Sequence, residues 1–241
     1  MKYVCEDVPR LIHCFGNEKN KIGVDEVVRM IKASHNHIIP INTHNIEEIN
    51  NWEDLPIGYK DACWRKLKNS MDVDGLIPVW NINIQNSYEK AIAHAERAIE
   101  LGGAKAIKLE VLNSELNWSD NEQLIKAAEY LSNKGYEVWP LLAPDENCVD
   151  RLVEIGCPMI RLMGSKIASG DGISSKAVEV LKYAKSKYPH VKIMLDGGVG
   201  CSADVYRALI YGFDSVLVNS YLFGLQISPS QELSNIVEVK N

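Results

Sequence analysis

The stretch from Ala104 to Leu142, AKAIKLEVLNSELNWSDNEQLIKAAEYLSNKGYEVWPLL, decides the fold. It begins with an apolar, β-type run (Ala104–Val111), continues with a helical pattern (Asp120–Lys134) and ends with a second apolar run (Glu137–Leu142). A strand, a helix and a second strand in this order form a right-handed βαβ unit, whose two strands lie parallel in one sheet. The stretch therefore predicts a parallel α/β structure.

The same alternation of apolar runs and helical patterns continues along the whole chain. Strands are predicted at Arg10–Phe15, His37–Thr43, Leu76–Ile82, Ala104–Val111, Glu137–Leu142, Pro158–Met163, Val191–Asp196 and Ser215–Asn219. Helices are predicted at Gly23–Ser34, Ser87–Leu101, Asp120–Lys134, Asn147–Ile155, Ser174–Lys187 and Ser202–Tyr211, with a weak pattern around Tyr59–Leu67. Eight such strands in a chain of 241 residues predict one (β/α)₈ TIM barrel over residues 1–241, in preference to a doubly wound sheet.

Composition excludes several classes of protein. The formal net charge is −6 and no block of Lys and Arg occurs, which argues against nucleic-acid binding. No apolar run is long enough to cross a membrane, and Met1–Arg10 lacks the apolar core of a signal peptide. The six cysteines show no zinc spacing, and His35 and His37 have no further ligand at a suitable distance in sequence. We predict a soluble cytoplasmic protein with reduced thiols and no metal or other bound cofactor.

Lys108 and Glu110 lie two residues apart in the predicted strand Ala104–Val111, so their side chains share a face. Burial lowers the pKa of a lysine and a nearby carboxylate raises it, so the pattern fits either a neutral amine or an ammonium. A neutral amine forms a Schiff base with a carbonyl, and the carboxylate can move the protons. The alternative from this segment alone is a salt bridge at the end of a strand.

Small residues follow three consecutive predicted strands in the second half. They form the segments Gly164–Ile173, Asp196–Gly200 and Val218–Ser220. Barrels bind phosphates in loops near strands seven and eight, where glycines let backbone N–H groups approach an anion. One such loop is most often a tight turn, but three together predict a phosphate site. Asp196, the last residue of its strand, serves either as an acid/base group or as a helix cap; Ser202 already offers a cap, which favours the first role.

Three further polar residues and two cysteines are candidates for contact with a substrate. Asn81 and Asn83 alternate with isoleucines, so both are predicted to face the barrel mouth, and His44 follows the second predicted strand. Buried amides need hydrogen-bond partners, and a substrate hydroxyl is as suitable as a protein group. Cys14 and Cys201 are expected near the barrel rims. Each is either a persulfide carrier or, more simply, a reduced thiol.

The motifs quoted above resemble those of the bacterial thiazole synthase family, which forms the thiazole of thiamin. The resemblance runs from about Ser87 to Ser220 and includes Ile107–Val111, Gly156-Cys157, Gly164–Ile173, Asp196–Gly200 and Val216–Ser220. It implies a (β/α)₈ barrel that forms an imine with 1-deoxy-D-xylulose 5-phosphate. Sulfur would come from a small sulfur-carrier protein with a C-terminal thiocarboxylate, and dehydroglycine would complete the ring. We also predict a homo-oligomer.

The resemblance implies a role for each matching residue. Lys108 would be the Schiff-base lysine, and Glu110 and Asp196 would transfer protons. The phosphate would be held by the backbone around Ala168 and by Gly170, Gly197, Gly198, Asn219 and Ser220.

The chain also departs from the family pattern, in its first third, its substrate pocket and its C-terminus. Ala168-Ser169 replaces the family's Gly-Ser, Ile82-Asn83-Ile84 replaces Thr-Ala-Gly, and Asn42–Asn45 replaces basic residues. The C-terminal helix of the family is expected to be mostly missing. These differences suggest a paralogue that acts on a different keto-sugar phosphate, or on the same one with a different outcome. The alternatives are a 2-thiosugar synthase, a non-catalytic barrel that binds a sugar phosphate, and an aldolase or lyase that uses the same lysine.

Overall fold

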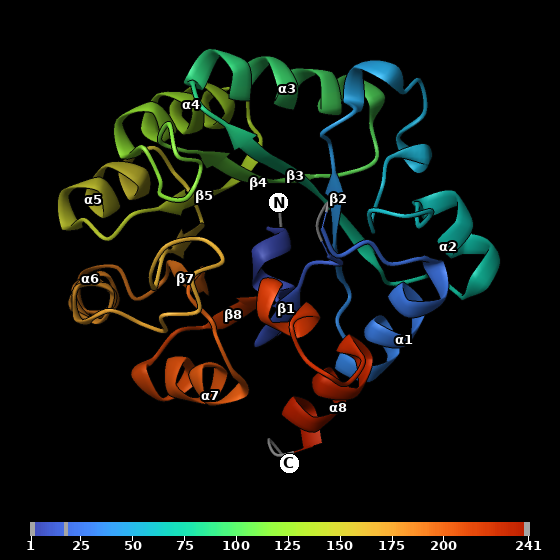
Figure 1. Ribbon diagram of the computed structural model, residues 1–241. Coiled ribbons are helices and arrows are strands. Elements are labelled where there is room, and N and C mark those ends of the chain that lie inside the picture. Colours follow the sequence, from blue (N-terminus) through green and yellow to red (C-terminus); the bar gives the residue numbers. More distant parts are fainter. Residues whose placement is uncertain (1–2, 17–18, 239–241) are drawn as a thin grey trace.

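The computed structural model describes residues 3–16 and 19–238, and within them eight parallel strands form one sheet curved into a barrel (Figure 1). The strands are β1 (Leu11–His13), β2 (Ile38–Asn42), β3 (Ile77–Gln85), β4 (Ala106–Val111), β5 (Glu137–Leu142), β6 (Met159–Leu162), β7 (Lys192–Asp196) and β8 (Ser215–Val218). Their order is β1-β8-β7-β6-β5-β4-β3-β2. The predicted (β/α)₈ barrel is confirmed.

Helices surround this sheet on the outside (Figure 1). They are α1 (Val24–Ser34), α2 (Trp64–Ser70), α3 (Tyr88–Leu101), α4 (Asn121–Asn133), α5 (Glu146–Glu154), α6 (Ser175–Lys187), α7 (Ser202–Tyr211) and α8 (Pro229–Glu238). Short 3₁₀ helices occur at η1 (Val4–Asp7), η2 (Ile46–Glu48), η3 (Trp52–Asp54) and η4 (Ser220–Phe223). The last α-helix, α8, was not among the predicted helices; Leu233 and Ile236 bury one of its faces, and it packs along α1.

Side chains alternate between the two faces of the strands, as the period of two requires. Ile12, Val79, Ala106, Met194 and others point inward and form a core inside the barrel. The residues between them, such as Ile107 on β4, pack outward against the helices in a second, larger core. In the described part of the chain, no helix has the length and apolar character needed to cross a membrane.

One end of the barrel is closed by the N-terminal segment. The carboxylate of Glu137, at the start of β5, accepts hydrogen bonds from the backbone N–H groups of Val4 (2.6 Å) and Cys5 (2.7 Å). It also accepts one from Nε1 of Trp139 (2.8 Å). These bonds hold η1 against the barrel interior, where Cys5 joins the inner core. The opposite end, where the strands finish, carries the residues predicted to form the site.

Candidate active site

Four charged side chains meet inside the barrel near the C-terminal ends of β4, β6 and β7. Nζ of Lys108 lies 3.0 Å from Oε1 of Glu110 and 3.7 Å from Oδ2 of Asp196. Arg161 lies 2.6 Å from the same two oxygens. All four residues are buried. The structure therefore places Lys108, Glu110 and Asp196 together, as the sequence predicts, and adds an arginine that sequence reasoning missed.

Arg161 escaped notice because it lies within the apolar run Met159–Leu162 of β6. The alternation of side chains along β6 could have revealed it, because Arg161 occupies an inward position between the apolar, outward-facing Ile160 and Leu162. A lone arginine at an inward position of a buried strand needs carboxylate partners. Which carboxylates these are depends on strand neighbours, and only the three-dimensional fold brings Glu110 and Asp196 to it.

Asn81 fixes the lysine from the other side. Nζ of Lys108 donates to Oδ1 of Asn81 (3.0 Å), and Nδ2 of Asn81 donates to Oδ1 of Asn42 (3.1 Å). Asn42 in turn donates from Nδ2 to the carbonyl of Ile57 (2.9 Å) and accepts from the hydroxyl of Tyr59 (3.4 Å). In both Asn81 and Asn42 the side-chain oxygen and nitrogen bond to different partners, so the orientation of each amide is determined.

The two other predicted substrate contacts lie further out. His44 is exposed and its ring stacks on that of Tyr59, with 5.3 Å between centroids. Asn83 is half-buried at a point where the register between β3 and β4 shifts. Ile82, expected to reshape the pocket, is fully buried in the outer core, because its position in β3 points away from Lys108.

The charges in the cluster balance, and this determines the state of the lysine. Burial and the charge of Arg161 oppose the ammonium form, but Glu110 and Asp196 outweigh them and raise the pKa of Lys108. Burial opposes ionisation of Glu110, yet the charges of Lys108 and Arg161 lower its pKa. Two cations and two anions therefore face one another, and the resting lysine is an ammonium.

Cys14, directly after β1, lies in the electrostatic field of this cluster. Burial raises the pKa of the Cys14 thiol, and the charge of Lys108 opposes this only in part. A protonated thiol is a weak nucleophile, which favours the simpler prediction of a reduced cysteine. Cys201 is exposed at the start of α7 and its thiol lies 3.6 Å from a carboxylate oxygen of Asp204.

The cap of α7 differs from the predicted one. Cys201 is the N-cap residue, and Ser202 is already the first residue of the helix. The carboxylate of Asp204 accepts from the backbone N–H groups of Gly200 (2.9 Å) and Cys201 (3.3 Å). A carboxylate satisfies these free N–H groups better than a hydroxyl because it carries charge. Asp196 takes no part in the cap and faces the cluster.

The first two predicted phosphate loops pack tightly against each other. The N–H of Gly172 donates to the carbonyl of Gly198 (2.7 Å), and a Cβ on Gly200 would come within 2.3 Å of the carbonyl oxygen of Gly170. Gly197 and Gly198 have φ of 98° and 87°, which favour glycine. Ala168, in the loop after β6, also has a positive φ, 58°. These residues lie together beyond the ends of β6 and β7.

The third segment follows β8 and contributes Asn219 and Ser220. The side-chain oxygen of Asn219 is buried and has no hydrogen-bond partner within the described part of the chain. A buried acceptor without a donor is costly, and a ligand that carries a hydroxyl removes that cost. Ser220 begins η4.

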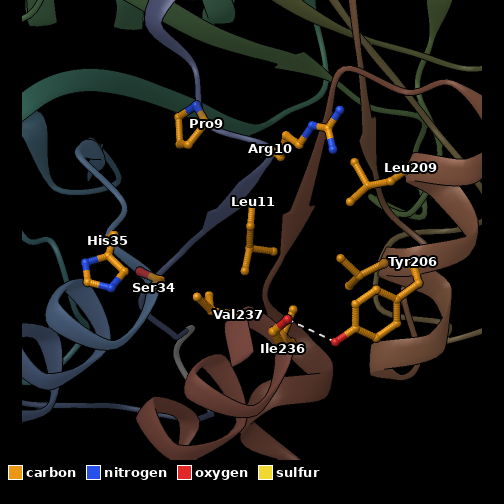
Figure 2. Close-up of a pocket in the computed structure, with 10 residues that line it drawn as sticks. Pro9, Arg10, Leu11, Ser34, His35, Tyr206, Leu209, Ile236 and Val237 are labelled. Carbon is orange, nitrogen blue, oxygen red and sulfur yellow. Dashed lines mark hydrogen bonds between the residues drawn. The ribbon is translucent and has the colours of Figure 1, made fainter. Parts of the chain in front are cut away.

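Two of the hollows in the described structure lie at the C-terminal rim and beside the start of β1. One, of about 430 Å³, opens at the C-terminal rim between the segment after β4 and the loop after β6; it is lined by Asn113, Asn117, Trp118, Gly164, Ser165, Lys166, Asp171 and Ser174. The other, of about 370 Å³, lies between the start of β1 and helices α1, α7 and α8, where the hydroxyl of Tyr206 donates to the carbonyl of Ile236 (Figure 2). None of the predicted site residues lines this second hollow, although His35 does. Among the described residues, no three His, Cys, Asp or Glu side chains are grouped to hold a metal ion.

The fold and the buried lysine with its carboxylates define a (β/α)₈ barrel of the type that works at the C-terminal ends of its strands. Comparison with protein families is more specific: residues 60–226, more than half of the chain, match the family model "Thiazole biosynthesis protein ThiG". The chain therefore belongs to the ThiG family.

Curated relatives agree with this assignment. The chain is 33% identical to the thiazole synthase of Brucella suis over 132 residues, which is 54% of this chain and 51% of that protein. It is 32% identical to the thiazole synthase of Bradyrhizobium diazoefficiens over 161 residues, 66% of this chain and 60% of that protein. The matches thus span only 51% and 60% of these two relatives' lengths.

A solved structure resembles the whole barrel. The crystal structure of the Amycolatopsis orientalis BexX/CysO complex contains a chain that superposes with a TM-score of 0.81. The superposition covers 98% of this chain and 90% of that one, at 21% sequence identity. This likeness shows that the two share a fold.

Proposed function

We propose that this protein is a thiazole-synthase-like enzyme that incorporates sulfur into a keto-sugar phosphate through an imine on Lys108. The substrate is 1-deoxy-D-xylulose 5-phosphate or a related sugar phosphate. Membership of the ThiG family supports the reaction class. The observation that carries the proposal is the position of Lys108, within 4 Å of two carboxylates at the strand ends of the barrel.

The first step is a proton transfer, because the resting ammonium of Lys108 has no lone pair. Glu110 or Asp196 accepts this proton, and the neutral amine then attacks the carbonyl carbon of the sugar. The oxygen takes one proton from the attacking nitrogen and the other from the carboxylic acid, so that one water leaves as the imine forms. Asn81 holds the lysine in line throughout, through its bond to Nζ.

The phosphate of the substrate binds beyond the ends of β6, β7 and β8. The loop after β6, with Ala168 and Gly170, lies against Gly197 and Gly198. Their lack of bulky side chains leaves backbone N–H groups open to an anion. Asn219 and Ser220 complete this end of the site from β8.

Sulfur arrives from a sulfur-carrier protein with a C-terminal thiocarboxylate. Its sulfur replaces an oxygen of the sugar, and the carrier leaves with a carboxylate in place of the thiocarboxylate. The similar barrel BexX forms a complex with CysO, which supports a protein partner for this chain. Assembly into a homo-oligomer and a cytoplasmic location stay predictions.

Borohydride trapping tests the imine directly. Incubation with 1-deoxy-D-xylulose 5-phosphate and a panel of keto-sugar phosphates should add the mass of one reduced sugar phosphate to the intact wild type. Lys108→Ala should stay unmodified, whereas the control Lys105→Ala, which removes an exposed lysine of the same segment, should react like the wild type. An adduct that persists in Lys108→Ala would place the chemistry on another residue.

A second candidate is a 2-thiosugar synthase that uses the same lysine on a sugar richer in hydroxyls. The unpaired oxygen of Asn219 favours it, because a sugar hydroxyl can donate to that atom. The sugar panel separates the two candidates by which compound is trapped fastest. Consumption of a thiocarboxylated carrier separates both from an aldolase, and a complete lack of trapping leaves a binding protein.

A further inference from the structure

Arg161 makes four hydrogen bonds and one further ion-pair contact inside the protein. An arginine has five N–H donors. Nε donates to Oδ2 of Asp196 (2.7 Å), and Nη2 contacts both this oxygen and Oε1 of Glu110, at 2.6 Å each. Nη1 donates to the carbonyls of Leu109 and Trp139, at 3.3 Å each. The side chain is fully buried, so none of its donors is accessible to a substrate.

The same bonds divide each carboxylate into an occupied and an open oxygen. Arg161 contacts Oε1 of Glu110 and Oδ2 of Asp196, and Lys108 lies beside the same two atoms. No donor in the described part of the chain contacts Oε2 of Glu110 or Oδ1 of Asp196. These side chains are 11% and 12% exposed, whereas Arg161 is 0% exposed. One oxygen of each carboxylate is thus held by Arg161 and Lys108, and the other is open for proton transfer.

We propose that Arg161 is a positioning residue that keeps Glu110 ionised and holds Glu110 and Asp196 so that one open oxygen of each faces the substrate. This inference rests on the proposed imine chemistry and assigns the control of its two proton-transfer groups. Arg161 itself touches no reacting atom.

The charge balance explains why such a residue is needed. Without Arg161, two carboxylates share one ammonium in a buried site with a net charge of −1. Two buried carboxylates that both lie 2.6 Å from one nitrogen of Arg161 are close neighbours, and without the cation they favour uptake of a proton, which neutralises one carboxyl group. A neutral carboxyl group cannot accept the proton of Lys108. With Arg161 present, the site is neutral while both carboxylates stay ionised.

Other groups around Lys108 do not replace this charge. β3 and β2 contribute the amides of Asn81 and Asn42, which do not titrate. The segment after β1 contributes Cys14, whose buried thiol is protonated. Among the described residues that act on Lys108, the arginine on β6 is the one further cation.

Infrared spectroscopy tests the inference without any substrate. In Arg161→Met at neutral pH, we expect the carbonyl stretch of a protonated carboxylic acid that is absent from the wild type. The band should disappear when Arg161→Met is combined with either Glu110→Gln or Asp196→Asn, and the combination that removes it identifies the protonated residue. Arg161→Lys, which keeps the charge, should lack the band. The control Arg151→Met removes an exposed arginine paired with Glu129 and Glu154 and should also lack it.

Imine trapping at a series of pH values provides the second measurement. In Arg161→Met the trapping rate should fall as the pH is lowered through about 7, where the wild type is still constant, because the carboxyl pKa rises by about 1–3 units without the cation. Arg161→Lys should trap more slowly at every pH, by about tenfold or more, because it lacks the planar fork that aligns both carboxylates. The acid limb of its profile, which is the pH range where the rate falls, should stay where it is in the wild type. A merely structural role for Arg161 lowers the rate without moving the limb in either variant.

The outcomes separate this inference from the proposed function. If the wild type traps no keto-sugar phosphate, the proposed function fails, and the infrared band still decides the role of Arg161. If the wild type traps the sugar but Arg161→Met shows neither the band nor the shifted limb, the inference is overturned. Should Arg161→Met not fold, Arg161→Lys decides: wild-type rates at every pH overturn the inference.

Discussion

At the scale of single residues, the neighbours of a buried group decide whether it keeps its charge. Lys108 is buried but stays an ammonium because two carboxylates lie beside it. His13 on β1 is also fully buried, and its Nε2 bonds to the neutral hydroxyl of Ser34 (2.8 Å). Burial lowers the pKa of His13 to about 4. The folded protein therefore holds His13 neutral, whereas the unfolded chain protonates it below its ordinary pKa.

His13 should make stability depend on pH. Above about pH 6.5 neither state binds the proton, and between about pH 6.5 and 4 only the unfolded chain binds it, so acid lowers the free energy of unfolding. From pH 7 to pH 5 the His13 contribution to this loss is about 2 kcal/mol. Urea unfolding at both pH values measures it, and His13→Leu should lose about 2 kcal/mol less than the wild type. An equal loss in both proteins would show that His13 does not titrate this way.

The sequence predicted Lys108, Glu110 and Asp196 as site residues and missed Arg161 for a physical reason. Lys108 and Glu110 are two residues apart on one strand, so the period of two alone places them together. Arg161 and Asp196 reach them from strands β6 and β7, and no local pattern contains that neighbour relation. Residues coupled through local geometry can be read from a sequence, while those coupled across the barrel need the fold.

At the scale of elements, buried strands were predicted best. β5 spans Glu137–Leu142, as predicted, because its apolar run is bounded by a turn on each side. α2 and α8 were predicted weakly or not at all: α2 has only seven residues, and α8 packs on α1, a partner more than 190 positions away in the chain. The strand β1 is shorter than predicted, since only Leu11–His13 pairs with β8.

Two glycines offer a matched test of the loops at the phosphate end. Gly198 and Gly135 have φ of 87° and 86°, so alanine strains the backbone equally at both. A Cβ on Gly198 would also lie 2.4 Å from the carbonyl oxygen of Gly172, whereas a Cβ on Gly135 meets nothing within 4 Å. Gly198→Ala should therefore lower the affinity for a keto-sugar phosphate by about tenfold or more, while Gly135→Ala leaves it unchanged. Isothermal titration measures both, and equal affinities would place the phosphate elsewhere.

At the scale of the whole molecule, the chain combines a matched and an unmatched part. The family match begins at residue 60, so β1, β2 and the 3₁₀ helices η2 and η3 lie outside it. These elements nevertheless contribute to the site, since Asn42 on β2 orients Asn81 and Cys14 follows β1. Lys108, Glu110 and Asp196 thus lie within the matched residues, and part of the wall around them comes from the unmatched N-terminal residues.

This division predicts the outcome of a complementation experiment in a thiazole-requiring strain. A site whose amides bond substrate hydroxyls rejects an analogue that lacks one by about 10⁴-fold, because its polar groups are left unpaired. 1-Deoxy-D-xylulose 5-phosphate lacks the hydroxyl at its first carbon, and the side-chain oxygen of Asn219, directly after β8, has no partner among the described residues. We expect weak or no growth from the wild-type chain, although it still traps some keto-sugar phosphate on Lys108. Lys108→Ala should support no growth and trap no sugar. Full growth with the unmodified chain, lost in Lys108→Ala, would instead establish an ordinary thiazole synthase whose polar wall does not select the sugar.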